Sequence, residues 1–148
     1  MKRYSKIVDL FLRAHNKFNL LESEPRDFST GDLLYSTEIH TIVAIGEKPA
    51  INLTQLAENL GVSKSAVSKF IKKLLKKGYV LKSRPVGNHK EVIFNLTDRG
   101  KTAFKGHEEF SREIFGSLYD ILENIADREI ITIENFLKKL NEELDDIK

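Results

Sequence analysis

The stretch LTQLAENLGVSKSAVSKF, residues 53–70, constrains the fold more than any other part of the chain. Its apolar residues recur at helical spacing on both sides of a break at Gly61, which predicts two short helices joined by a tight turn. Ala57 is small enough for the two helices to cross closely. The second helix has three candidate apolar anchors, Val62, Val67 and Phe70. This spacing is typical of a helix-turn-helix motif.

The second of these helices has one apolar face and one polar face. Ser63 is a suitable N-cap, and Gly78 ends the helix after about Lys77. The residues expected to face inward are Ala66, Val67, Phe70, Ile71 and Leu74, and those left projecting outward are Lys64, Ser65, Ser68, Lys69 and Lys72. In a helix-turn-helix the second helix enters the major groove of DNA. Lys64, Ser65, Ser68 and Lys69 are therefore candidates for base contacts, with lysine suited to guanine acceptors.

After Gly78 the apolar period changes from 3.6 to 2. Residues 79–83 and 91–96 alternate as strands, and residues 85–89 connect them, so a hairpin is predicted. Arg84, His89 and Lys90 flank or form its tip, where a basic hairpin can lie on the backbone or the adjacent minor groove. Candidates for phosphate contacts are Lys72, Lys73, Lys82, Arg84 and Lys90.

The other segments are mainly helical. Helices are predicted over residues 4–21, from a cap at Ser36 to Gly46, from Thr97 to Leu118 or beyond, and from about Asp127 to the end. Residues 24–32 are expected to form a loop, and either Asn52 or Thr54 caps the helix at 53–60. The fold class is mainly α with a small β-hairpin wing. Because the first and last helices both have apolar stripes and no third layer covers them, we expect a homodimer.

The charge is distributed unevenly, although the formal net charge is only +2. Residues 59–90 contain nine lysines and arginines and no acidic residue, whereas the rest of the chain has 15 basic and 22 acidic residues. A local cationic surface of this kind binds polyanions, because each neutralised phosphate releases a counterion. The basic segment coincides with the predicted helix-turn-helix and hairpin.

The order of these elements, together with the run Leu96-Thr97-Asp98-Arg99-Gly100 after the hairpin, resembles the MarR family of winged-helix transcriptional regulators. The resemblance covers nearly the whole chain. It implies a winged DNA-binding domain at 35–98, a helical dimerisation region formed by 1–34 and 118–148, and a linking helix at 97–117. It also implies binding of the homodimer to pseudo-palindromic double-stranded DNA, usually as a cytoplasmic repressor that a small ligand, a metal or an oxidant releases.

The sequence departs from the family pattern in the wing. Members commonly have Asp-Arg-Arg where this chain has Asn88-His89-Lys90, so the minor-groove arginine is replaced by histidine and its acidic brace by a neutral amide. Lys90 substitutes only in part for that arginine. The chain has no cysteine, which excludes the thiol-oxidation switch of one branch of the family.

The sequence offers weaker support for three other functions. His40, His107 and Glu108 are candidate ligands for a zinc-responsive regulator, but a zinc site needs at least three protein ligands. A winged-helix module that binds protein instead of DNA would not need its lysines. An enzyme is not expected, because the chain has no phosphate loop, dinucleotide-binding turn or His-Glu-x-x-His motif. No cofactor and no membrane association are expected.

Overall fold

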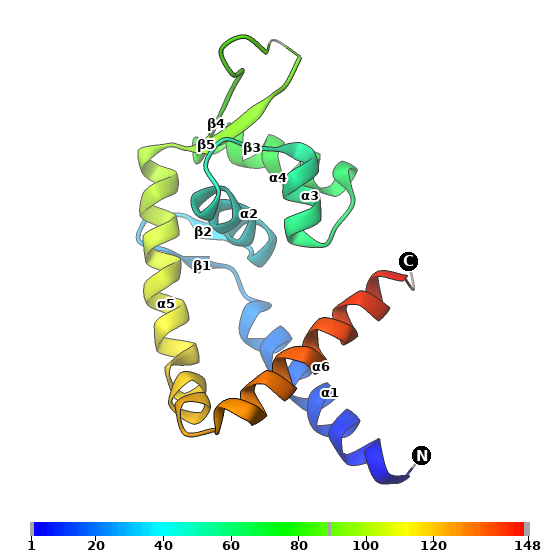
Figure 1. Ribbon diagram of the computed structural model, residues 1–148. Helices are drawn as coiled ribbons and strands as arrows, with labels where there is room; N and C mark the ends of the chain where they lie inside the picture. Colours follow the sequence, from blue (N-terminus) through cyan, green and yellow to red (C-terminus); the bar gives the residue numbers. More distant parts are fainter. Residues whose placement is uncertain (1, 89, 147–148) are drawn as a thin grey trace. The chain divides into compact units, whose positions relative to one another are not determined.

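The computed structural model describes residues 2–88 and 90–146. The chain divides into two compact units, Met1–His107 and Glu108–Lys148. The elements follow in the order α1 (Lys2–Glu22), β1 (Arg26–Asp27), β2 (Leu33–Leu34), α2 (Ser36–Glu47), β3 (Ile51–Asn52), α3 (Leu53–Leu60), α4 (Lys64–Lys76), β4 (Val80–Ser83), β5 (Ile93–Leu96), α5 (Asp98–Glu123) and α6 (Asp127–Asp146) (Figure 1). The mainly α fold with a β-hairpin is confirmed.

The wing belongs to a three-stranded antiparallel sheet with strand order β3-β5-β4. The hairpin pairs Val80 with Leu96 and Lys82 with Phe94, as the change to period 2 predicts. The third strand, β3, was not predicted, since it is only two residues long and pairs Ile51 with Phe94 across a long sequence separation. The middle strand of the sheet is therefore β5, and the wing is tied at its base to the segment that leads into α3.

The core of the first unit lies between helices α2, α3 and α4 and the sheet. The largest fully buried apolar side chains come from every one of these elements, from β2 and from the turn before β4: Leu34, Ile42, Ile45, Ile51, Leu56, Val67, Leu74 and Tyr79. With Ile39 and Ile71, which are also buried, the buried apolar residues of α2 and α4 recur every three or four residues, so each of these helices buries one face. Burial of the apolar face of α4 directs its polar face toward solvent.

Two predicted details of the first unit are wrong. The α2 helix begins at Ser36, but its N-cap is Tyr35, and the carboxylate of Glu38 accepts a hydrogen bond of 3.0 Å from the Tyr35 backbone N–H. The predicted loop at 24–32 contains the short strand β1, which pairs with β2 just after the loop, around a turn in which Asp27 Oδ1 accepts hydrogen bonds from the N–H groups of Thr30 and Gly31. Strands of two residues have no detectable periodicity.

The motif Leu-Thr-x-x-Gly forms the junction between the wing and α5. Thr97 Oγ1 accepts a hydrogen bond of 3.0 Å from the Gly100 N–H and donates one of 2.7 Å to the Gly78 carbonyl. Gly100 itself lies so close to the carbonyl oxygen of Tyr79 that a Cβ atom would collide with it. Thr97 therefore caps α5, as predicted, and glycine is required three residues later for close packing.

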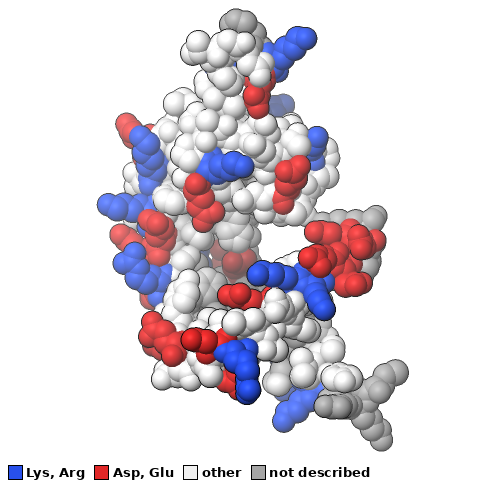
Figure 2. All heavy atoms as spheres, in the orientation of Figure 1, with Lys and Arg blue, Asp and Glu red and all other residues white. Residues whose placement is uncertain are grey.

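The second unit contains the end of α5 and all of α6. Helix α6 runs through Asp127–Asp146 and buries none of its residues, although its apolar stripe has the predicted helical spacing. Figure 2 shows acidic side chains gathered near its C-terminal end. Within the described residues, no helix has the length and hydropathy needed to cross a membrane.

Candidate nucleic-acid interface

The turn between α3 and α4 is held by backbone hydrogen bonds. Gly61 has a φ of 62°, a left-handed conformation that favours glycine. The N–H of Gly61 donates to the Glu58 carbonyl at 3.2 Å and that of Val62 to the Ala57 carbonyl at 3.1 Å, which closes α3. Val62 is exposed, so its predicted role as an anchor is wrong.

The start of both helices follows the predicted capping pattern. The side chain of Asn52 accepts a hydrogen bond of 2.9 Å from the Gln55 N–H, which selects Asn52 over Thr54 as the cap of α3. Ser63 Oγ accepts one of 3.3 Å from the Ala66 N–H and caps α4. The orientation of α4 at its N-terminal end is therefore set by local hydrogen bonds.

The two faces of α4 separate as the sequence predicted. Val67, Ile71 and Leu74 are buried, and Ala66 and Phe70 are half-buried. The five residues expected to project outward are all exposed: Lys64, Ser65, Ser68, Lys69 and Lys72. Three cations and two short hydroxyl side chains thus share one accessible helix face. A helix needs such a face in order to approach base edges closely.

The wing adds further exposed cations. Lys82, Arg84 and Lys90 are exposed, and His89 lies outside the described residues. Figure 1 shows the wing extending beyond α3 and α4 within this unit. Eight of the nine basic residues at 59–90 are exposed, and Lys77 is half-buried. We call the exposed set on α4 and the wing, Lys64, Lys69, Lys72, Lys73, Lys76, Lys82, Arg84 and Lys90, the cationic surface.

Glu91 connects the wing tip to the start of α3. Its carboxylate accepts a hydrogen bond of 2.8 Å from Asn52 Nδ2 and one of 3.2 Å from Asn88 Nδ2. Asn88 in turn accepts a bond of 3.3 Å from the Lys90 N–H. Sequence reasoning treated Asn88 only as the loss of an acidic brace and did not consider Glu91. The signal was available, since Glu91 is the first acidic residue after a basic run of 32 positions.

A buried carboxylate holds the C-terminal end of α4. Glu38 on α2 is fully buried, and its Oε1 lies 2.7 Å from Lys77 Nζ and 3.9 Å from Lys73 Nζ. Burial alone would raise the pKa of Glu38, but hydrogen bonds from Lys77 and the Tyr35 N–H and the charges of both lysines outweigh it, so the pKa lies below its usual value of 4.5. Lys73 is still 62% exposed, but its ammonium faces Glu38.

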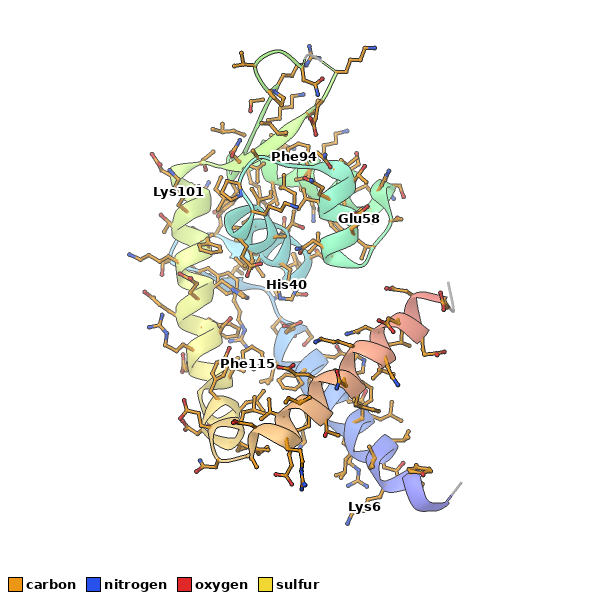
Figure 3. All side chains as sticks on the ribbon, in the orientation of Figure 1. Lys6, His40, Glu58, Phe94, Lys101 and Phe115 are labelled. Carbon is orange, nitrogen blue, oxygen red and sulfur yellow. The ribbon has the colours of Figure 1, made fainter. Side chains whose placement is uncertain are left out.

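The candidate metal ligands are only partly brought together. His40 Nε2 lies 3.5 Å from a carboxylate oxygen of Glu22, and the His40 and His107 rings meet edge-on with centroids 5.8 Å apart. Figure 3 labels His40 on α2. Glu108 is exposed. Among the residues that the structure describes, no three histidine, aspartate or glutamate side chains converge on one point.

Comparison with known proteins gives a consistent picture. A model of the MarR family matches residues 34–92. The chain is 31% identical over 109 residues to the HTH-type transcriptional regulator PchR of Bacillus subtilis. The aligned region covers 74% of this chain and 64% of PchR. It is 27% identical over 141 residues to the transcriptional regulator ZitR of Lactococcus lactis, covering 92% and 94%.

The uncharacterized HTH-type transcriptional regulator YhjH of Bacillus subtilis is 30% identical, and the chain spans 61% of its length. The chain therefore spans less than two thirds of the length of both YhjH and PchR. Among solved structures, that of Streptococcus pneumoniae FabT in complex with DNA has a TM-score of 0.73 and 24% identity, covering 98% of this chain and 99% of that one.

Proposed function

Because the chain belongs to the MarR family of winged-helix proteins, we propose that it is a sequence-specific, double-stranded DNA-binding regulator of transcription. It acts in the cytoplasm as a homodimeric repressor that a small ligand releases from DNA. The relatives support this proposal, since PchR and ZitR are transcriptional regulators and the FabT structure contains DNA. No catalytic role is part of the proposal.

The observation that carries the proposal is the exposed polar face of α4. It presents Lys64, Ser65, Ser68 and Lys69 in the first turns of the helix, the part that meets base edges in helix-turn-helix proteins. The first two turns carry no acidic residue that would repel phosphate. The alternative use of the same fold, as a protein-docking module, gives no reason for this clustering of cations.

The cationic surface and the two serines between its first lysines divide into two roles. Lys64, Ser65, Ser68 and Lys69 contact bases, whereas Lys72, Lys82, Arg84 and Lys90 contact phosphates and fix the register of the protein. Lys73 contributes less, because Glu38 already neutralises part of its charge. His89 is assigned to the wing tip on sequence position alone.

The experiment that tests this function is selection from a random duplex pool followed by sequencing of the bound fraction. An enriched inverted repeat with half-sites about 34–36 Å apart is the expected result, because two recognition helices of a dimer enter successive major grooves. The logarithm of the binding constant should fall with the logarithm of salt concentration, with a slope of roughly −0.9 per phosphate contact. Absence of both enrichment and salt dependence would instead favour the protein-docking module.

Two substitutions separate the roles within the surface. Lys69→Ala should lower the ratio of specific to random DNA affinity, whereas Lys82→Ala should weaken both by about the same factor. Lys105→Ala is the matched control, since Lys105 is an exposed lysine of α5 outside the cationic surface. An unchanged ratio for Lys69→Ala would show that Lys69 does not read bases.

The homodimer is supported by apolar side chains that the protomer leaves exposed. On α1 these include Ile7, Val8 and Phe11, at 38–55% exposure, and on α6 they include Ile133 and Phe136, at 38% and 50%. Helices with such stripes bury them against another copy in symmetric oligomers. Sedimentation equilibrium should give twice the monomer mass of 17.0 kDa, and Phe136→Glu should shift the protein to monomer.

A zinc-responsive regulator is the second candidate. The contact between His40 and Glu22 favours it, and ZitR of Lactococcus lactis has been described as zinc-responsive. His107 contacts His40 through its ring, but no three such side chains converge among the described residues, so a third ligand would have to move into place. Calorimetric titration with zinc decides the matter, with His40→Ala as the control variant: tight binding that this variant abolishes would favour a metal-responsive protein.

A further inference from the structure

Arg99, in the first turn of α5, contacts three segments that are far from one another in the sequence. Its Nη1 donates a hydrogen bond of 3.1 Å to the Lys77 carbonyl, at the end of α4. Its Nη2 lies 2.7 Å from Oδ2 of Asp32, the residue that precedes β2. The guanidinium carbon lies 4.8 Å from the centre of the Tyr79 ring. Arg99 therefore ties the end of the recognition helix α4 to the segment that connects α1 with α2.

The C-terminal end of α4 is held by the start of α5. A helix leaves its last carbonyl groups without partners inside the helix. The Lys77 carbonyl accepts the hydrogen bond from Arg99. The Gly78 and Tyr79 carbonyls, which follow it, accept bonds of 2.7 Å from Thr97 Oγ1 and 3.1 Å from the Thr97 N–H. These directional bonds fix the end of α4, whereas burial of its apolar face is non-directional.

Asp32 holds the guanidinium of Arg99 in place. The carboxylate oxygen that pairs with Arg99 also accepts a hydrogen bond of 3.2 Å from the Tyr79 hydroxyl. Tyr79 is fully buried, so Asp32 is itself bonded to a side chain of the core. A planar guanidinium presents the fork of donors that a carbonyl and a carboxylate together require, whereas the ammonium of lysine is a single point on a flexible stem. The position of Arg99 therefore depends on Asp32 and on the shape of its own guanidinium.

We propose that Arg99 is a positioning residue of DNA recognition, which together with Asp32 sets the angle of α4 and thereby its sequence specificity. The proposal rests on the proposed function, since it assumes that residues in the first turns of α4, such as Lys64 and Lys69, contact bases. Neither Arg99 nor Asp32 needs to touch DNA for this effect.

The length of α4 explains why its far end is sensitive. Its 13 residues span about 20 Å, so a rotation of about 5° about the C-terminal end moves the N-terminal end by roughly 1.7 Å. Hydrogen-bond lengths vary by only about 0.5 Å, so base contacts in the first turns do not survive such a shift. Phosphate contacts made by flexible lysines adapt to it. Loss of the Arg99 contacts should therefore lower the affinity ratio, by which we mean the affinity for the selected duplex divided by that for random duplex.

Substitution of Asp32 tests the proposal through the sign of its effect. Asp32→Asn removes a negative charge, which on electrostatic grounds alone should strengthen binding to every duplex. Loss of positioning should instead lower the affinity ratio about tenfold, the effect of losing roughly one base contact. The matched control is Asp98→Asn, which removes the same charge from a fully exposed side chain paired with Lys101 and should leave the ratio unchanged. An unchanged ratio in Asp32→Asn would overturn the proposal.

Substitution of Arg99 distinguishes positioning from a direct phosphate contact. Arg99→Lys keeps the charge and loses the fork, so it should lower the affinity ratio nearly as much as Arg99→Gln does. The salt dependence of binding should keep its slope in both variants. Rescue by lysine, or a slope that is shallower by roughly 0.9 in Arg99→Gln, would show a phosphate contact and overturn the proposal.

The double variant Asp32→Asn/Arg99→Gln tests whether the two residues act through their ion pair. Its affinity ratio should fall no further than that of Arg99→Gln alone, because both changes break the same contact. Additive losses would contradict joint action. All affinities are measured by fluorescence anisotropy on the full chain at constant ionic strength, and circular dichroism shows whether each variant is folded. If Arg99→Gln fails to fold, Arg99→Lys takes its place in the double variant.

Two-dimensional ¹H–¹⁵N NMR of the protein without DNA separates this proposal from the proposed function. Asp32→Asn should shift the amide signals of residues 64–69, at the opposite end of α4, whereas Asp98→Asn should leave them unchanged. Unshifted signals at 64–69 in Asp32→Asn would overturn the positioning role. If the wild-type protein selects no duplex, the proposed function fails, while these signals still decide whether Asp32 and Arg99 set the angle of α4.

Discussion

The ion pair between Glu38 and Lys77 makes a quantitative prediction about stability. Lys77→Met removes the ammonium and keeps most of the hydrocarbon stem, so packing changes little. Glu38 has a side-chain exposure of only 1% and cannot regain water when its partner is lost. Removal of one member of a buried pair costs about 3–5 kcal/mol. Because Lys73 stays 3.9 Å from the same oxygen, we expect the free energy of unfolding to fall by about 3 kcal/mol, which is the lower end of this range.

The pH dependence of this loss identifies its cause. The native pKa of Glu38 is lowered, so the pair stabilises the protein above pH 4.5 and this contribution is lost as pH falls through the native value. In Lys77→Met, burial without the ammonium favours the protonated carboxyl group, so Glu38 destabilises the variant at neutral pH. The difference between the two proteins should therefore be largest near neutral pH and should shrink in acid.

The assay is urea unfolding followed by far-ultraviolet circular dichroism at one fixed protein concentration, because association of protomers also contributes to stability. The matched control is Lys101→Met, which breaks an ion pair with Asp98 in which the side chains are 68% and 100% exposed. Exposed pairs of this kind contribute little, so the control should leave the midpoint unchanged. A loss in Lys77→Met that matches the control, or that does not vary with pH, would refute the reasoning.

Three further substitutions test other parts of the first unit. Gly100→Ala should destabilise the protein by about 2 kcal/mol in urea unfolding, because the added Cβ meets the Tyr79 backbone carbonyl, which cannot turn aside; a neutral effect would mean that α5 packs less closely. Tyr79→Phe should cost about 1 kcal/mol in the same assay, since the buried hydroxyl contacts Thr30 and Asp32, and an unchanged midpoint would count against these contacts. Glu91→Ala should leave the preferred half-site sequence unchanged but weaken DNA binding several-fold in anisotropy titrations, because the wing tip loses the hydrogen bonds that Glu91 accepts from Asn52 and Asn88. Unchanged affinity would show that the wing tip does not need these bonds.

Much of the fold could be predicted because the strong signals are local. The faces of α4 follow from spacing alone, and the caps Ser63 and Thr97 follow from the chemistry of single residues. The features that were missed depend on distant partners or lack a period. Strand β3 exists because residues 51 and 52 meet residues 93 and 94, and nothing in the sequence around Ile51 indicates this pairing.

The site shows the same division between local and distant determinants. Exposure of the five outward residues of α4 was predictable, but the contact of Lys73 with Glu38 was not, because these residues are 35 positions apart on different helices. The brace at Glu91 likewise depends on Asn52, whose side chain was considered only as a helix cap. Spacing identifies which residues are accessible, whereas their partners are determined by tertiary packing.

The pairing of β3 with β5 also governs the order in which the protein can fold. The two strands enclose the whole helix-turn-helix and the outer strand of the wing, so the sheet is completed only when a loop of roughly 40 residues closes. Helices α3 and α4 depend on near neighbours and can form earlier. During synthesis the recognition helix can therefore emerge and dock before β5 exists, and β5 completes the domain when it pairs with residues 51–52 on one side and residues 80–83 on the other.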